Sequence, residues 1–169
     1  AIFGVLGAGN KAQINALLRQ GREFYEVNPL DFIDTDIVKR FENHTKAFVK
    51  IQEGCDYACS YCIIPSVRGK SRSISEETLI KQVLILADNG YTEFVLTGTN
   101  IGSYGRKDGT SLGRLLQRLG AVNGVKRIRL GSLEPAQIDE SFKEILDEPW
   151  IERHLHIALQ HTSEKMLRL

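Results

Sequence analysis

The sequence has no long apolar run and no marked excess of charge of one sign. No stretch approaches the roughly 20 apolar residues of a membrane-spanning helix, and the first residues lack the charged start and cleavage site of a signal peptide. The 22 lysines and arginines stand against 21 aspartates and glutamates, so the average field does not steer the chain towards nucleic acid. A hydrophobic share of 42% is ordinary for a globular protein. We therefore expect a globular protein that does not associate with membranes.

Cysteine is scarce, and all three residues lie close together, at Cys55, Cys59 and Cys62. A secreted protein more often spreads an even number of cysteines along its chain to form disulfides. The odd and clustered set favours a reducing compartment, and we expect a cytoplasmic protein.

An initiating methionine is also lacking, and the chain begins inside an apolar segment, Ala1–Leu6. We therefore expect a piece of a longer protein. Residues 1–44 predict a small α/β unit: a strand to Leu6, a helix that ends at Gly21, a short strand at 25–27 and a linker over 28–44. We interpret 1–44 as the end of a preceding domain plus its linker, and 45–169 as a second domain.

From Thr45 onward the sequence alternates between strand and helix patterns. Ser75 is a predicted helix N-cap followed by acidic residues in the first turn, and apolar residues at helical spacing continue from it. The predicted strands are 47–51, 93–96, 127–130 and 154–159, and the predicted helices are 76–89, 112–119, 138–146 and 164–169.

Four strand–helix units in series predict an α/β fold with parallel strands and right-handed crossovers. Such a sheet must be covered by helices on at least one face, and it can curl into a barrel. We expect a partial parallel (β/α) barrel that stops after about four units. Because chemistry in such barrels lies on the loops after the strands, the cysteine loop that follows the first strand is the candidate site.

The cysteine spacing is C-x3-C-x2-C, with all three thiols in one loop. Thiolates are the natural ligands of iron–sulfur clusters. Three ligands on a four-iron cubane leave one iron without a protein ligand, and an open metal position is what a small cofactor or substrate needs. The pattern therefore predicts a 4Fe–4S cluster with one open iron site.

Other readings of the three cysteines remain open at this point. Structural zinc takes four ligands, and His44 is a candidate for the fourth. An electron-transfer cluster would normally have four protein ligands. Three unrelated buried thiols are the plainest alternative, although their close spacing disfavours it.

The loop resembles the CxxxCxxC signature of the radical S-adenosylmethionine superfamily, and its surroundings resemble the methylthiotransferase branch. The segments that carry this resemblance are Lys50–Cys55, Tyr61–Pro65, Arg68–Ser73, Leu96–Gly105, Arg127–Pro135 and Leu155–Gln160. It covers nearly all of 45–169, and residues 1–44 resemble the tail of the preceding domain in that family. The run Thr97–Gly105 most resembles enzymes that act on threonylcarbamoyladenosine in tRNA. The isopentenyladenosine and ribosomal-protein branches resemble it less.

The resemblance implies a specific chemistry. The open iron would bind S-adenosylmethionine, and the radical formed from it would take hydrogen from C2 of the adenine in the tRNA. A second 4Fe–4S cluster in the preceding domain would carry the inserted sulfur, and its cysteines are not present here. A flavodoxin-like or ferredoxin-like protein would supply the electron. We expect the 169-residue chain to be inactive by itself.

The same resemblance suggests which residues meet the cofactor and the RNA. The candidates for S-adenosylmethionine contacts follow the strands or lie in the cysteine loop: Tyr61, Thr97, Gly98, Asn100, Ser132, Glu134 and Gln160. Each could instead be an ordinary loop residue, and Glu134 could pair with an arginine. Arg68, Lys70 and Arg72 could contact tRNA phosphates, which give affinity without reading sequence, or form a solvated basic loop.

Two further patterns carry weaker predictions. Gly7-Ala8-Gly9-Asn10-Lys11-Ala12 fits the dinucleotide-binding pattern, with Glu26 near the expected acidic position, but the unit is short and runs into a linker. His154 and His156 share a predicted strand face, where hydrogen bonding is a commoner role than metal binding.

Overall fold

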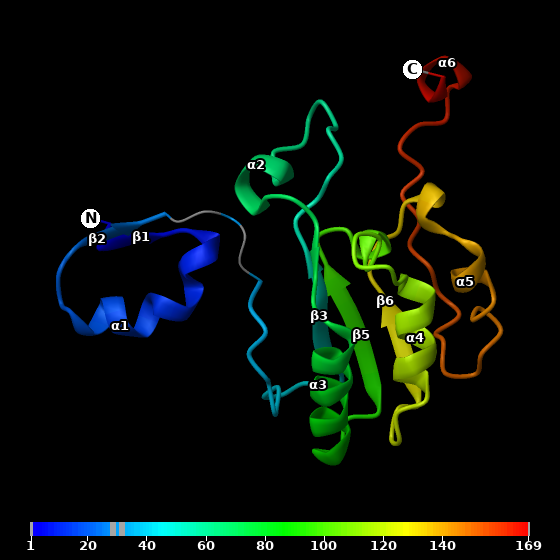
Figure 1. Ribbon diagram of the computed structural model, residues 1–169, viewed down its shortest axis with the longest axis horizontal. Helices are drawn as coiled ribbons and strands as arrows, with labels where there is room; N and C mark the ends of the chain where they lie inside the picture. The colour runs from blue at the N-terminus through cyan, green and yellow to red at the C-terminus, as the bar shows by residue number, and fades with distance from the viewer. Residues whose placement is uncertain (1, 28–29, 31–32, 169) are drawn as a thin grey trace.

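A four-stranded sheet forms the centre of the computed structural model, which describes residues 2–27, 30 and 33–168 (Figure 1). The strand order is β4-β3-β5-β6. The strands β3 (Ala47–Glu53), β5 (Glu93–Gly98) and β6 (Arg127–Leu130) run parallel. The two-residue β4 (Arg72–Ser73), which was not predicted, pairs antiparallel with the end of β3. The α/β class and the parallel sheet are thus confirmed.

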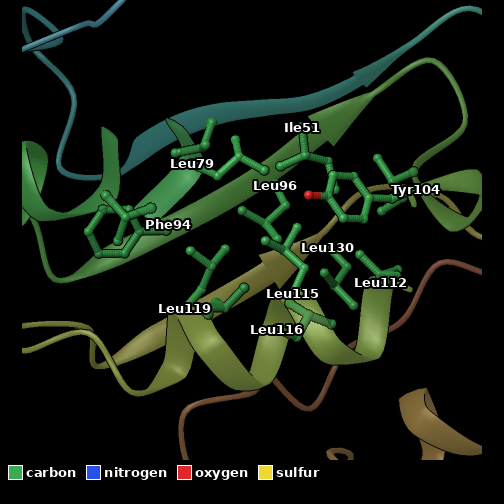
Figure 2. Close-up of a cluster of buried hydrophobic side chains, with 14 of the residues drawn as sticks. Ile51, Leu79, Phe94, Leu96, Tyr104, Leu112, Leu115, Leu116, Leu119 and Leu130 are labelled. Atoms are coloured by element: carbon green, nitrogen blue, oxygen red, sulfur yellow. The ribbon is translucent and has the colours of Figure 1, made fainter. Parts of the chain in front are cut away.

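Two helices, α3 (Glu76–Asp88) and α4 (Leu112–Gly120), cover one face of this sheet (Figure 1). Alternate strand residues point towards them, and their leucines fill the space between the layers (Figure 2). The labelled core side chains are Ile51, Leu79, Phe94, Leu96, Tyr104, Leu112, Leu115, Leu116, Leu119 and Leu130. Each fully buried side chain of this size contributes roughly 1.5–3 kcal/mol through the hydrophobic effect, so this layer holds the strand ends in place.

Serine side chains cap the N-terminal ends of α3 and α4. The backbone N–H of Thr78 donates to Ser75 Oγ at 3.3 Å, as predicted for the start of α3. The N–H of Arg114 donates in the same way to Ser111 Oγ at the start of α4. These side chains satisfy donors that the helix itself leaves without partners.

The third predicted helix is much shorter than expected. Only α5 (Glu140–Lys143) is helical, after the short η3 (Pro135–Gln137), although Phe142 and Ile145 are buried as the pattern required. The helix begins only after Asp139, whose side chain caps it by accepting from the N–H of Phe142 at 2.9 Å, and residues 144–147 form turns instead of continuing it. At the C-terminal end, α6 (Glu164–Leu167) forms one turn of the helix predicted for 164–169.

The prediction of a regular fourth strand over 154–159 is wrong. In this segment Ile157 forms an isolated bridge with Leu133, and a second bridge, between Ile151 and Ile128, lies before the segment. The strand β6 ends at Leu130, so residues 154–159 pass beyond its end, where the backbone of Leu133 bonds to His156 and Ala158. The sheet therefore has three regular parallel strands instead of four, beside the antiparallel β4.

A small unit precedes the sheet. Its strands β1 (Gly4–Leu6) and β2 (Phe24–Glu26) pair in parallel and are joined by η1 (Ala8–Gln13) and α1 (Ile14–Arg19). The two predicted strands are confirmed, but the helix begins as a 3₁₀ helix after Gly7. Within the described residues this is a single short βαβ unit, far smaller than the doubly wound sheet of two βαβαβ halves on which dinucleotide binding depends.

Residues 33–46, together with residue 30, form an irregular arm between the two units. Gln82 of α3 exchanges two hydrogen bonds with the backbone of Val38, at 2.8 and 2.6 Å. The hydroxyl of Tyr91 bonds in the same way to both backbone groups of Phe41, at 2.8 Å each. The arm is therefore pinned to the sheet domain. Residues 28–29 and 31–32 of the predicted linker lie outside the described residues. Among those described, no helix is long and apolar enough to cross a membrane.

Candidate metal and cofactor site

The cysteine loop lies between β3 and α2 (Ile64–Arg68), beyond the carboxyl ends of the parallel strands (Figure 1). The N–H of Cys55 donates to the carbonyl of Gly69 at 3.0 Å, which closes the base of the loop. Gly54 has a positive φ of 78°, and a Cβ there would overlap the Lys70 carbonyl. Only glycine permits this conformation and this close approach, so the glycine before Cys55 sets how the loop leaves the strand.

All three cysteines line one cavity of about 160 Å³. Its other walls come from the loops after β5 and β6 and from the C-terminal segment. The predicted site residues that the cavity brings together are Cys55, Cys59, Cys62, Tyr61, Asn100, Ser132, Glu134 and Gln160. Thr97 and Gly98 do not line it, and they face a neighbouring groove. Thr99 and Asn100 take their place at the end of β5.

The donor set fits an iron–sulfur cluster. The three thiols are free, with Cys59 exposed and the other two half-buried. His44 cannot complete a zinc site, because it precedes β3 and its ring packs edge-on against Phe48 at 5.6 Å. The seven residues of β3 separate it from the loop by roughly 20 Å. Within the part of the chain that the structure describes, no three His, Cys, Asp or Glu side chains converge on the position of a single ion.

A buried amide holds the start of the cysteine loop. Gln52 is fully buried, and its Nε2 donates to the carbonyl of Gly54 at 2.6 Å and to Ser71 Oγ at 3.0 Å. Its Oε1 accepts from the N–H of Asn100 at 2.8 Å. Gln52 therefore ties the loop after β3 to the loop after β5.

A second buried amide extends this connection to the loop after β6. Gln137 is only 3% exposed, and its Nε2 donates to Asn100 Oδ1 at 2.6 Å while its Oε1 accepts from the N–H of Glu134 at 3.0 Å. The amide of Asn100 in turn reaches Cys55 Sγ at 3.5 Å. A continuous set of hydrogen bonds thus links three strand ends to one candidate ligand.

Gln52 and Gln137 were not predicted from the sequence as site residues. Gln52 has the strand parity of the exposed Phe48 and the half-buried Lys50, so the alternation of the strand gave no signal that its side chain would be buried. Gln137 lies in a loop after Pro135, where nothing local marks it as buried. Both matter because partly satisfied buried amides are costly, and these two are satisfied by bonds that span the whole site.

The predicted cofactor contacts bond to one another. Gln160 donates from Nε2 to Glu134 at 2.7 Å and accepts from the hydroxyl of Tyr61 at 3.1 Å. Ser132 Oγ and His156 Nδ1 lie 2.8 Å apart. Glu134 therefore has an amide partner instead of the alternative arginine, and His156 has the hydrogen-bonded role.

Charged residues flank the loop in pairs. Glu53 bonds to Arg68 at 2.9 Å and to Lys50 at 3.3 Å. Burial raises the pKa of Glu53, but these two cations outweigh it and hold the pKa below its ordinary value. On the other side, a hydrogen bond from Lys107 lowers the pKa of Asp56.

The three cations predicted to contact RNA differ in their surroundings. Arg68 is bound to Glu53. Arg72 turns inward and donates to the carbonyls of Lys70 and Arg68, at 2.8 and 3.0 Å. Lys70 is exposed.

Comparison with known families matches residues 49–169 to the Radical SAM superfamily. The chain belongs to this superfamily. Its sequence relatives are named as methylthiotransferases. A Helicobacter pylori protein classed as a methylthiotransferase is 51% identical over 166 residues, which cover 97% of this chain and 40% of that protein.

Relatives with named substrates are more distant. The threonylcarbamoyladenosine tRNA methylthiotransferase of Bacillus subtilis is 46% identical over 78% of this chain and 30% of that protein. A ribosomal protein methylthiotransferase of Desulforudis audaxviator is 36% identical over 98% of this chain and 38% of its own length. The chain thus spans about two fifths of the length of the Helicobacter and Desulforudis relatives, which match nearly all of it.

A solved structure supports the fold. The radical S-adenosylmethionine methyltransferase TsrM of Kitasatospora setae aligns with a TM-score of 0.57 at 19% identity, over 72% of this chain and 23% of that one. At this identity the likeness shows the α/β radical SAM fold alone.

Proposed function

We propose that the protein is a radical SAM tRNA methylthiotransferase that inserts a methylthio group at C2 of N6-threonylcarbamoyladenosine. The observation that carries this proposal is the convergence of three free cysteines with the polar residues of the β5 and β6 loops on one cavity. The Bacillus subtilis enzyme named for this nucleoside is also more similar than the Fervidobacterium nodosum dimethylallyladenosine synthase, which is 34% identical.

The residues of this chain have separate tasks in the proposed reaction. Cys55, Cys59 and Cys62 would hold a 4Fe–4S cluster, which would supply the electron for reductive cleavage of S-adenosylmethionine and thereby the radical chemistry at C2. Asn100 donates towards Cys55 and, with Gln52 and Gln137 behind it, keeps the loop in place.

The opposite wall of the cavity binds the cofactor. Ser132, Glu134 and Gln160 offer a hydroxyl, a carboxylate and an amide to the polar groups of S-adenosylmethionine, and Tyr61 offers an aromatic ring to its adenine. Thr97 and Gly98, at the end of β5, line the neighbouring groove instead of this cavity. Lys70, with Arg68 and Arg72, lies towards the RNA.

The rest of the enzyme completes the proposal. Residues 1–44 belong to a preceding domain that holds a second 4Fe–4S cluster as sulfur source, and 45–169 belong to the radical SAM core. The match of residues 49–169 to the Radical SAM superfamily supports the second part of this division. We expect a cytoplasmic protein that receives its electron from a flavodoxin-like or ferredoxin-like donor, and no activity from this chain alone.

Anaerobic reconstitution of the full-length protein with iron and sulfide tests the cluster. We expect the broad visible absorbance of iron–sulfur thiolates and cleavage of S-adenosylmethionine on reduction. The Cys59→Ser variant should lose both, whereas Ser60→Ala, in the same exposed loop, should keep both. Stoichiometric zinc without iron would contradict the proposal.

A ribosomal-protein substrate is the second candidate, because the Desulforudis relative covers 98% of this chain. Mass spectrometry of tRNA nucleosides and of ribosomal proteins from a deletion strain decides between the two. Loss of methylthiolated threonylcarbamoyladenosine supports the proposal, and loss of a methylthiolated ribosomal protein supports the alternative.

A further inference from the structure

A second hollow lies directly beside the cysteine cavity. This open groove of about 420 Å³ is lined by Lys11, Lys50, Glu53 and Arg68 together with the end of β5; we call it the cationic groove. Ile64 and Thr99 line both the groove and the cysteine cavity. A ligand at the cavity can therefore extend past Thr99 into the groove without crossing the sheet.

The groove has more positive than negative charge. Three cations face one carboxylate, which leaves a net charge of +2. Lys50 and Arg68 both bond to Glu53, and their side chains are 34% and 40% exposed. An ammonium has three donors and a guanidinium has five, so each retains donors beyond its bond to Glu53.

The position of Lys50 is fixed by the sheet. It lies on β3 opposite Thr97 of β5, on the face that α3 and α4 do not cover. Lys11 reaches the same groove from η1, and its charge contributes to lowering the pKa of Glu53. Lys11 and Lys50 thus come from different units of the chain, and both line the cationic groove beside the cysteine cavity.

We infer that the cationic groove binds the carboxylate of the substrate's N6 substituent and selects threonylcarbamoyladenosine over uncharged N6 substituents. This inference rests on the proposed function. A threonylcarbamoyl group ends in a free carboxylate, whereas a dimethylallyl group has no charge. Arginine and lysine donors that are partly removed from water form strong, charge-assisted hydrogen bonds to carboxylates. The same donors could instead meet a backbone phosphate of the RNA, so the test separates these two sources of negative charge.

The test compares three anticodon stem-loop RNAs that differ only at the target adenosine: threonylcarbamoyl, dimethylallyl or unmodified. Their dissociation constants are measured with the full-length, anaerobically reconstituted protein. Lys50→Gln should weaken binding of the threonylcarbamoyl RNA about tenfold, the loss of one charge-assisted hydrogen bond, and should leave the other two RNAs within twofold. Lys50→Arg should keep the preference.

Lys46→Gln is the matched control. Lys46 precedes the same strand, is 41% exposed and pairs with Glu93 at 3.2 Å, away from the groove. It should leave all three affinities unchanged. Circular dichroism shows whether each variant is folded. If Lys50→Gln does not fold, Lys11→Gln is the second variant that tests the groove.

The outcomes are distinct. An equal loss of affinity for all three RNAs in Lys50→Gln would mean a phosphate contact and would overturn the inference. A second result is that the wild type prefers the threonylcarbamoyl RNA and that both Lys50→Gln and Lys11→Gln keep that preference. This result would overturn the inference about the cationic groove and leave the proposed function intact. Failure of the wild type to bind any of the RNAs would overturn both.

Discussion

Replacing the buried Gln52 by methionine should loosen the cysteine loop more than a substitution at a solvent-exposed position. Methionine keeps the length of the side chain but removes its donor and its acceptor. The N–H of Asn100 and the carbonyl of Gly54 then lose their bonds to this amide, whereas Ser71 Oγ still has Ser103 Oγ at 2.8 Å. At about 1–2 kcal/mol for each of these two buried groups left unsatisfied, the lower part of the usual range, we expect the free energy of unfolding to fall by about 2–4 kcal/mol.

The assay combines stability with the state of the loop. For a domain of this size, each kcal/mol lowers the melting temperature by about 2–4 °C, so the apoprotein should melt roughly 5–15 °C lower. The thiol of Cys55 should react faster with an alkylating reagent, and less iron should be bound after reconstitution.

Gln82→Met is the control for this prediction. Gln82 is also a buried glutamine, and it makes two hydrogen bonds to Val38, at a distance from the cysteines. Its replacement should lower the melting temperature without changing thiol reactivity or iron uptake. If Gln52→Met melts with the wild type and binds as much iron, the buried amides are not what holds the loop.

Two further predictions concern the frame around the site. The cations Arg129 and Lys46 outweigh the effect of burial and lower the pKa of Glu93 from 4.5; its contribution to stability is therefore present above the unfolded pKa and is lost as pH falls through the folded value. Urea unfolding should show that Glu93→Gln is less stable than the wild type at pH 7 and that this difference shrinks below about pH 4.5; a pH-independent difference would refute this. Gly113→Ala should destabilise α4 although alanine favours helices by about 1 kcal/mol, because a methyl there would overlap the Ser141 backbone. Gly131→Ala, whose methyl would meet only ordinary contacts, should melt closer to the wild type, and the reverse order would count against the packing argument.

The sequence determined the features that depend on neighbouring residues. The C-x3-C-x2-C spacing placed the three thiols in one loop, and period-2 and period-3.6 patterns identified the strands β3, β5 and β6 and the helices α3 and α4. Ser75 marked the start of α3 correctly because an N-cap bonds within its own first turn. Each of these signals lies within a few residues of the structure that it predicts.

Only the tertiary structure decided what meets at the carboxyl edge of the sheet. It placed Gln52, Asn100 and Gln137 in one set of hydrogen bonds, although they lie far apart in the sequence. It also showed that Thr97 and Gly98, which the sequence predicted at the cofactor site, lie outside the cysteine cavity, because β5 continues to Gly98. A side-chain amide carries no periodic signal, and its partner is set by which loops the packed core brings together. The site was therefore recognisable from its ligands, while the residues that hold those ligands became visible only in the fold.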